Sequence, residues 1–371
     1  MLLTLLLAAC TGTDGADTAS ECGGAGTICT IAGTGTAGLG GEGTPATETN
    51  LYLPIDATVG PDGLLYLLDW NNHRIRVLDD EGTLTTLAGT GELGDGPEGP
   101  AIEAKFNHPT NIAFDSAGRM LISAWHNSRI MRIDLTTDML EFVAGDGTRS
   151  FGGDGADPRL AKLDLPSGIA LNSRDEIFIG DQANQRIRCV TTENLMDTIG
   201  GVGTPGFSGD GGPAVDAEMH ASVGQAASPA NRLVITDDDR MLYFVDTENH
   251  RVRQIDLGTG VIDTYVGNGT PGYGGDGADR LGASLYQPTD LALGPDGELY
   301  IADTSNSCVR RVDPDGVIST FAGTCGEMGY TGDGGAPEDA LLNRPYGVEV
   351  DGAGNVYISD TYNQVVRVVY K

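Results

Sequence analysis

Short segments in which apolar and polar residues alternate recur along the chain, and they recur in sets of four. Residues 288–293, 298–303, 308–313 and 317–323 form one such set, with a Pro-Asp-Gly turn at 295–297. Alternation over about four to eight residues, bounded by Gly, Pro and Asp, predicts β-strands joined by tight turns. The pattern therefore predicts an all-β chain built from small four-stranded units.

One motif marks each of these units. It reads Asp-Trp-Asn-Asn-His-Arg-Ile-Arg at residues 69–76, and related sequences follow at intervals of 55 to 65 residues. Hydrophobic residues stand three and six positions after each anchoring asparagine, so both faces of every sheet are expected to be buried. Small sheets that are buried on both faces and repeated radially are the blades of a β-propeller. Six copies predict six blades, and the anchoring residues are Asn72, Asn127, Asn184, Asn249, Asn306 and Asn363.

The two ends of the repeat array complement each other. The last unit has its third strand at 365–370 and no fourth strand after it, whereas residues 31–35 match the fourth-strand pattern at 87–91 without a unit before them. The N-terminal strand is therefore expected to complete blade six and close the ring, leaving no long exposed edge. The expected blades span about 54–91, 109–147, 166–203, 229–269, 288–325, and 345–371 together with 28–35.

The asparagine turns resemble those of the NHL-repeat family. The resemblance rests on Asn-His-Arg-Ile at 72–75 and Asn-His-Arg-Val at 249–252, and it covers residues 27–371. It implies a six-bladed β-propeller. It implies little about activity, because the family includes enzymes, RNA binders and protein-interaction modules.

The N-terminus resembles an export signal. Residues 1–9 are apolar but far fewer than the roughly 20 that a membrane-spanning helix needs. Leu-Ala-Ala-Cys at 7–10 resembles a bacterial lipobox, in which Cys10 would carry the lipid; an ordinary secretory peptide is the alternative. Thr11 after the cysteine is typical of lipoproteins sent to the outer membrane, and residues 10–26 are expected to form a flexible tether. The expected location is extracytoplasmic, as an outer-membrane lipoprotein or a secreted protein, with membrane contact only through the lipid.

The remaining cysteines agree with export, since disulfides persist in oxidising compartments. Cys22 and Cys29 are close in sequence and are expected to pair, tying the tether to the first strand. Cys308 and Cys325 flank two antiparallel strands and are expected to form a second disulfide. Cys189 is left over and is expected to be a buried, inert thiol.

Composition narrows the class of partner. Asp and Glu total 53 against 22 Lys and Arg, giving a net charge of −31. A nucleic-acid binder needs a basic surface, so nucleic acid is excluded as a partner. The chain contains 56 glycines, but its strands are hydrophobic, so the glycines indicate repeated turns rather than disorder. We expect a monomer.

Charged residues repeat with the motif. An aspartate precedes most asparagine turns and an arginine follows most of them, and we expect these to bond across or between blades. Blade two has Ala124 at the position of the aspartate in the other blades. Blade five has Cys308 at the position of the arginine, and the disulfide of Cys308 is expected to substitute for the lost ion pair. The aspartates are Asp69, Asp181, Asp246, Asp303 and Asp360, and the arginines are Arg74, Arg129, Arg186 and Arg251.

A second acidic set lies in glycine-rich loops between blades. These carboxylates form a ring on the face of the asparagine turns, where they could attract Ca²⁺ or a cationic partner, or could stabilise their own loops through local backbone bonds. We favour the second explanation, because one carboxylate per loop is too sparse for a calcium site with six to eight oxygens. The residues are Asp95, Asp154, Asp210, Asp276 and Asp333.

The first strand of each blade is expected to line the central channel. Two positions after the first-strand proline stand Asp56, Asn111, Asn231 and Asp290. Their oxygens could converge on a Ca²⁺ ion, similar in kind to the channel Ca²⁺ of gluconolactonase-type propellers. The alternative is a set of solvated polar groups.

These features favour a non-enzymatic binding scaffold that presents its loop-rich face to a protein, peptide or glycan and requires no cofactor. The alternative is a Ca²⁺-dependent enzyme of the lactonase or hydrolase kind, or a lyase, with the cation in the channel. No catalytic residue is assigned, since the sequence contains no metalloprotease helix and no nucleophile elbow.

Overall fold

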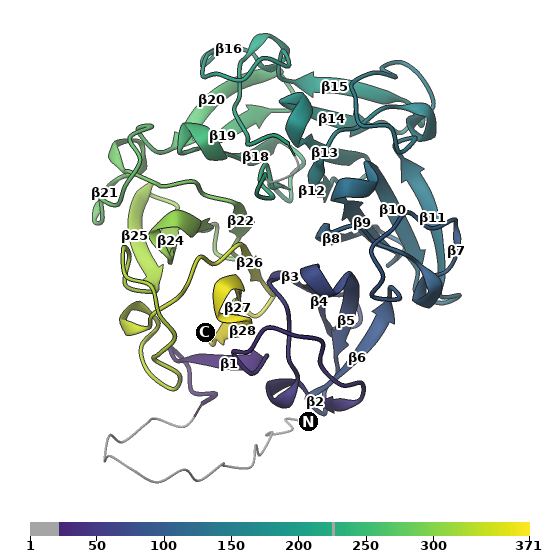
Figure 1. Cartoon of the computed structure of the whole chain (residues 1–371). Helices are drawn as coiled ribbons and strands as arrows, with labels where there is room; N and C mark the ends of the chain where they lie inside the picture. Colours follow the sequence, from purple (N-terminus) through teal and green to yellow (C-terminus); the bar gives the residue numbers. More distant parts are fainter. Residues whose placement is uncertain (1–21, 225–226) are drawn as a thin grey trace, which may run out of the picture.

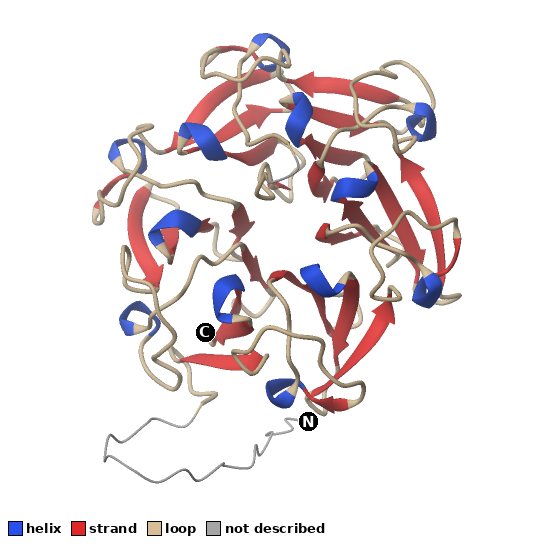
Figure 2. Cartoon of the chain, in the orientation of Figure 1, coloured by secondary structure: helices blue, strands red, loops and turns tan. Residues whose placement is uncertain are grey.

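Six antiparallel sheets surround a central channel (Figure 1; Figure 2). The structure is a computed structural model that describes residues 22–224 and 227–371. The first strand of each blade lies at the channel, and the second, third and fourth strands of the blade lie progressively outwards. The prediction of an all-β, six-bladed propeller is confirmed. Cys10 and the proposed signal peptide lie outside the described residues.

Each of the first five blades contributes four consecutive strands. Blade one contains β3 (Pro54–Val59), β4 (Leu65–Asp69), β5 (Arg74–Leu78) and β6 (Thr83–Ala88). Blade two contains β8 (Pro109–Phe114), β9 (Met120–Ala124), β10 (Arg129–Asp134) and β11 (Met139–Ala144). Blade three contains β12 (Pro166–Leu171), β13 (Ile177–Asp181), β14 (Arg186–Val190) and β15 (Met196–Gly200). Blade four contains β17 (Leu233–Ile235), β18 (Met241–Asp246), β19 (Arg251–Asp256) and β20 (Val261–Val266). Blade five contains β22 (Asp290–Leu293), β23 (Leu299–Asp303), β24 (Cys308–Val312) and β25 (Val317–Ala322).

The sixth blade closes the propeller ring with strands from both ends of the chain. It contains β26 (Gly347–Val350), β27 (Val356–Asp360), β28 (Val365–Val369) and β1 (Ile28–Ala32). Strand β1 pairs antiparallel with β28, with Ile28 opposite Val369 (Figure 1). The backbone N–H of Tyr370 also donates to the carbonyl of Thr27 at 3.1 Å. The prediction that the N-terminal strand completes the last blade is confirmed.

Short 3₁₀ helices form the asparagine turns between second and third strands (Figure 2). They are η2 (Trp70–Asn72), η4 (Trp125–Asn127), η6 (Gln182–Asn184), η8 (Thr247–Asn249), η10 (Thr304–Asn306) and η12 (Thr361–Asn363). A second set follows the loops between blades: η1 (Ala46–Glu48), η3 (Ala101–Glu103), η5 (Pro158–Leu160), η7 (Ala214–Asp216), η9 (Arg280–Gly282) and η11 (Pro337–Asp339). Two-residue strands precede four of these: β2 (Thr44–Pro45), β7 (Gly99–Pro100), β16 (Gly212–Pro213) and β21 (Ala278–Asp279).

The hydrophobic core lies between neighbouring blades rather than at the channel. One cluster joins Leu68 and Ile75 of blade one to Ile122 and Ile133 of blade two. Full burial of such a side chain contributes about 1.5–3 kcal/mol. The hydrophobic residue three positions after each anchoring asparagine is at most 1% exposed, which explains why the motif repeats: Ile75, Ile130, Ile187, Val252, Val309 and Val366.

Both predicted disulfides are present, between Cys22 and Cys29 and between Cys308 and Cys325. The thiol of Cys189 is free and buried, as expected, and burial raises its pKa to about 12. Within the part of the chain that the structure describes, no helix is long and apolar enough to span a membrane.

Candidate functional site

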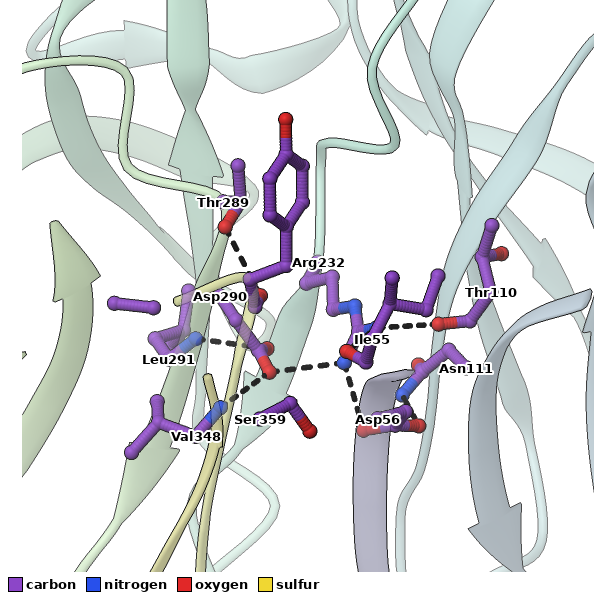
Figure 3. Close-up of polar contacts among 12 residues, drawn as sticks. Ile55, Asp56, Thr110, Asn111, Arg232, Thr289, Asp290, Leu291, Val348 and Ser359 are labelled. Carbon is purple, nitrogen blue, oxygen red and sulfur yellow. Dashed lines mark hydrogen bonds and ion pairs between the residues drawn. The ribbon is translucent and has the colours of Figure 1, made fainter. Parts of the chain in front are cut away.

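A buried arginine crosses the central channel. Arg232 directly precedes β17 of blade four and is 3% exposed. Its Nη1 donates to Oδ1 of Asp56 at 2.8 Å and to Oδ2 of Asp290 at 2.9 Å, in blades one and five (Figure 3). Its Nη2 donates to the backbone carbonyl of Ile55 at 2.9 Å and to that of Thr110 in blade two. One guanidinium therefore ties blade four to blades one, two and five.

The two carboxylates also bond to neighbouring blades. Asp56 accepts the backbone N–H of Ile112 at 2.7 Å. Asp290 accepts the backbone N–H of Val348 at 3.0 Å (Figure 3). Burial raises the pKa of Asp290 to about 7, while the charge of Arg232 opposes that shift. Burial disfavours the charge of Arg232, but Asp290 and Asp56 outweigh it and raise the pKa of the guanidinium. The first strands are thus joined around the axis by a paired and hydrogen-bonded polar cluster.

The expected calcium ligands are only partly brought together. Asp56, Asn111 and Asp290 meet near the axis, and Asn111 donates its Nδ2 to Asp56 at 3.0 Å. Arg232 places its charge between the two aspartates, where the sequence had suggested a divalent cation. Among the described residues, no group of three or more His, Cys, Asp or Glu side chains could hold a metal ion.

Asn231 does not bond to the other three: it is 1% exposed, and neither Nδ2 nor Oδ1 has a hydrogen-bond partner among the described residues. The backbone carbonyl of Arg232 accepts the N–H of Val245, the residue before Asp246. In blade five, Asp290 lies opposite Ala302, the residue before Asp303. Arg232 and Asp290 therefore occupy equivalent positions in their blades. Blade four has two residues between Pro229 and Arg232, whereas blade five has one residue between Pro288 and Asp290. Counting two positions from Pro229 therefore selected the residue before the one that points inward.

On the side of the asparagine turns, the channel widens into a pocket of about 240 Å³, which we call the turn-face pocket. Its aromatic wall consists of Trp70, His108, Trp125, His126, Tyr346 and Tyr362. Ile55, whose carbonyl binds Arg232, also lines it, so the axial cluster adjoins its inner end. Among the described residues that line it, none is Asp, Glu, Lys or Arg.

The aromatic side chains of this pocket pack on one another. Trp125 stacks on His126 with ring centroids 4.2 Å apart, and Trp70 contacts His108 at 4.6 Å. Burial is the largest cause that lowers the pKa of His108 and of His126 to about 4, so both imidazoles are neutral at pH 7. Tyr362 is 44% exposed and offers its ring to the opening.

A second pocket lies on the other side of Arg232. It has a volume of about 370 Å³ and includes Asp56, Asp237, Asp290 and Glu349. Burial is the largest cause that raises the pKa of Glu349 well above its ordinary value, followed by the neighbouring aspartates. The channel thus has an uncharged aromatic end and an acidic end, with Arg232 between them.

Comparison with known proteins agrees with the turns and the blades. The family model described as NHL repeat matches residues 51–78 and 285–312, which contain the first and fifth asparagine turns. The chain thus carries NHL repeats on a six-bladed β-propeller. A curated relative, Protein SUPPRESSOR OF QUENCHING 1, chloroplastic, from Arabidopsis thaliana, is 28% identical over 263 residues, covering 67% of this chain and 24% of its own length. The NHL propeller described here therefore spans about a quarter of that relative.

Solved structures share the propeller fold. A protein of unknown function from Bacteroides thetaiotaomicron superposes with a TM-score of 0.67 at 17% identity, covering 92% of this chain and 74% of its own. An auxiliary nutrient binding protein from the same organism superposes with a TM-score of 0.64 at 16% identity, covering 92% and 75%. These likenesses establish the fold of the NHL propeller.

The turn aspartates of the NHL repeats bind their own turns and a buried arginine. Asp69 accepts the backbone N–H of Tyr52 at 2.7 Å and Nδ2 of Asn72 at 2.8 Å, and it lies 3.7 Å from Nη1 of Arg76. Arg74 instead pairs with Glu42, in the loop between blades six and one, at 3.2 Å and donates to the carbonyl of Thr90 at 3.1 Å, so the expected ion pair between blades forms with a different carboxylate. The arginines that face the turn aspartates are the second ones of the motif, all 0% exposed: Arg76, Arg188, Arg253, Arg310 and Arg367.

Blades two and five depart from this pattern in different ways. Blade two has Ala124 and Met131 in place of the aspartate and the buried arginine, so no unpaired charge is left in the core. The backbone N–H of Asn107 donates to Oδ1 of Asn127 at 2.8 Å instead. In blade five the inner pair, Asp303 and Arg310, remains at 3.5 Å. The disulfide of Cys308 therefore does not substitute for a lost pair, which corrects the sequence-based expectation.

The acidic loop residues also face these arginines. Asp210 lies 2.6 Å from Arg253 and Asp333 lies 2.6 Å from Arg367, while Asp154 and Asp276 pair with Arg188 and Arg310. In blade two, Asp95 pairs with Arg129 at 2.5 Å. The ring of carboxylates thus forms ion pairs with guanidinium groups. These contacts join segments far apart in sequence, so the loops are not stabilised by local backbone bonds alone.

Glycine is required in these loops by close packing. Gly153 has φ of +92°, and a Cβ there would lie 2.6 Å from Cα of Ala161. The aromatic residue before it, Phe151, lies under the guanidinium of Arg186 at 3.8 Å. The asparagine turns share this face, since Nδ2 of Asn72 donates to the carbonyl of Gly38 in the loop between blades six and one.

Sequence reasoning missed the aromatic pocket. Trp70, His108 and Trp125 lie in different turns and loops, and their side chains meet only because two blades adjoin. A signal existed, because the chain's two tryptophans occupy the same position of consecutive repeats, directly after Asp69 and Ala124. That position is the first residue of the 3₁₀ helix in the asparagine turn.

Proposed function

We propose that this NHL propeller is a non-catalytic extracellular binding protein that holds its ligand in the turn-face pocket. The observation that carries the proposal is the pocket itself, a cavity walled by Trp70, Trp125, His108 and Tyr362 at the mouth of the channel, with no Asp, Glu, Lys or Arg among its described lining residues. Binding sites are typically concave and mostly apolar, with a few polar groups that orient the ligand.

The channel cluster supports binding rather than metal catalysis. Asp56 and Asp290, the two carboxylates expected to hold a cation, already share the guanidinium of Arg232. Buried carboxylates in an ion pair lack free oxygens for a calcium ion. No observation favours the Ca²⁺-dependent enzyme over the binding protein.

Two observations support an extracellular location. The disulfides Cys22–Cys29 and Cys308–Cys325 are stable in oxidising compartments. A fold neighbour is named as a nutrient binding protein. Lipidation of Cys10 and attachment to the outer membrane remain predictions, tested by metabolic labelling with a palmitate analogue and its loss in Cys10→Ala.

The pocket provides its own reporter. Trp70 and Trp125 are the two tryptophans of the chain and both line the pocket, so tryptophan emission reports occupancy. Probes to titrate are methyl glycosides, choline and N-acetyl aromatic amino acid amides. We expect a saturable change in emission with one of these classes, weakened in Tyr362→Ala and unchanged in Tyr286→Ala.

The control residue is matched in exposure. Tyr286 is 40% exposed against 44% for Tyr362, and it does not line the turn-face pocket. Equal affinity of both variants and the wild type would place the ligand elsewhere on the propeller. Absence of any saturable response would remove the support for a small-ligand pocket.

A further inference from the structure

We propose that the turn-face pocket takes a single uncharged sugar ring at the end of a glycan. This inference rests on the proposed binding function and names the ligand class. Peptides, aromatic compounds and quaternary ammonium groups are the competing occupants, and the turn-face pocket distinguishes among them by charge, by polar groups and by size.

The absence of charge at the described lining positions excludes ligands that need a counter-charge. His108 and His126 are neutral at pH 7, and the Arg232 cluster at the inner end is already paired. The guanidinium of Arg344 lies 5.3 Å from the ring centroid of Tyr362 but does not line the pocket. A buried carboxylate or ammonium group without a partner is costly. A free amino acid, a peptide terminus or an acidic sugar would therefore lose affinity here.

The polar groups favour a hydroxylated ligand over a purely aromatic one. The hydroxyl of Ser228 lines the pocket and is exposed. It accepts the hydroxyl of Tyr346 at 3.2 Å, while its own O–H donates to no described residue. A sugar ring presents an apolar C–H face to an aromatic side chain and hydroxyl groups around its edge, so it can satisfy both kinds of surface.

An aromatic amino acid side chain would stack on the same rings but would cover the hydroxyl of Ser228 without bonding to it. An unsatisfied buried donor or acceptor costs about 1–3 kcal/mol. A quaternary ammonium group likewise has no hydrogen bond to donate or accept. The hydroxyl of Ser228 therefore favours the sugar.

Size and shape favour one terminal ring. The pocket of about 240 Å³ is smaller than the roughly 300–1,000 Å³ typical of sites for drug-sized ligands. Arg232 adjoins its inner end and bonds to three other blades, so a longer chain cannot pass through the channel. The rest of the glycan would extend outward past the exposed ring of Tyr362.

The test uses isothermal titration calorimetry with the whole chain and matched small probes. These are the methyl glycosides of glucose, galactose, mannose and N-acetylglucosamine, together with methyl glucuronide, choline and N-acetyltryptophan amide. We expect at least one neutral glycoside to bind, and methyl glucuronide to bind at least tenfold more weakly than methyl glucoside or not at all.

Variants separate stacking from folding. Tyr362→Ala is expected to weaken glycoside binding about tenfold, and Tyr362→Phe to preserve it, because the ring and not the hydroxyl makes the stack. Tyr286→Ala is the control, and thermal melting confirms that each variant folds.

The outcomes distinguish the inference from the function on which it rests. Tyr362-dependent binding of choline or of the tryptophan amide, with none of the neutral glycosides, overturns the sugar assignment and leaves the binding function standing. Binding of the glucuronide as tight as that of the glucoside overturns the requirement for an uncharged ligand. No Tyr362-dependent binding of any probe overturns both.

Discussion

Replacing Arg232 with methionine tests whether the channel cluster holds the propeller together. The substitution keeps most of the length of the aliphatic side chain but removes the guanidinium. Asp56 and Asp290 then remain buried, with side chains 4% and 7% exposed, and the carbonyls of Ile55 and Thr110 lose their donor.

The expected cost is large for a single substitution. Breaking a buried ion pair by removing one partner costs about 3–5 kcal/mol. Here burial already raises the pKa of Asp290 to about 7, so this group can take up a proton in the variant and limit the loss. We therefore expect Arg232→Met to lower the free energy of unfolding by about 3 kcal/mol at pH 7.

The defect has a predicted pH dependence. An aspartate whose folded pKa is raised above its unfolded value binds its proton more tightly in the fold, so the stability it contributes falls as pH rises toward the folded pKa. Without Arg232 the pKa of Asp290 rises further. The loss caused by Arg232→Met should thus be greater at pH 8 than at pH 5.

Guanidinium chloride unfolding followed by circular dichroism measures this cost. Arg240→Met is the control, because Arg240 is 67% exposed in its pair with Asp256 and should change stability by no more than about 0.5 kcal/mol. Adding Asp56→Asn and Asp290→Asn to Arg232→Met should restore part of the loss. A loss below about 1 kcal/mol at pH 8 would refute the role assigned to the cluster.

Three further predictions concern closure, cross-linking and the pocket. Deleting residues 22–35 removes β1 and should lower the melting temperature and broaden the calorimetric transition; a transition as high and as sharp as that of the full chain would contradict ring closure. Replacing Cys308 and Cys325 with alanine should cost about 3 kcal/mol in denaturant unfolding, from the 17-residue separation that the disulfide spans, and a loss under about 1 kcal/mol would contradict this. Because burial lowers the pKa of His108 and His126 to about 4, their contribution to stability should be constant above about pH 6.5 and fall as pH drops toward 4. Tryptophan emission should change with a midpoint near pH 4, and a midpoint near 6.5 would show that the imidazoles are not shielded.

The fold could be predicted because its signals are local and repeated. The asparagine turn, the buried position three residues later and the strand alternation each recur six times. A departure from the pattern in one repeat therefore does not change the predicted fold, because the other repeats still show the pattern. The pairing of Cys308 with Cys325 followed from the same strand register, and the disulfide is present.

The partners of individual charges were harder to predict. The sequence shows two arginines in the motif, and spacing alone did not reveal that Arg76 rather than Arg74 faces Asp69. Alternate residues of a strand point to opposite faces, but which face meets the turn depends on the twist and packing of the blade.

The sequence by itself determined the number of blades, the closure of the ring and the residues buried between blades, because these follow from periodicity along one strand or one turn. Only the tertiary structure decided what converges on the axis. One extra residue before β17 turns Arg232 inward in place of Asn231, and six blades arranged around an axis bring Asp56 and Asp290 to the same guanidinium. The turn-face pocket likewise exists only where neighbouring blades meet, since residues distant along the chain become neighbours through the closing of the ring.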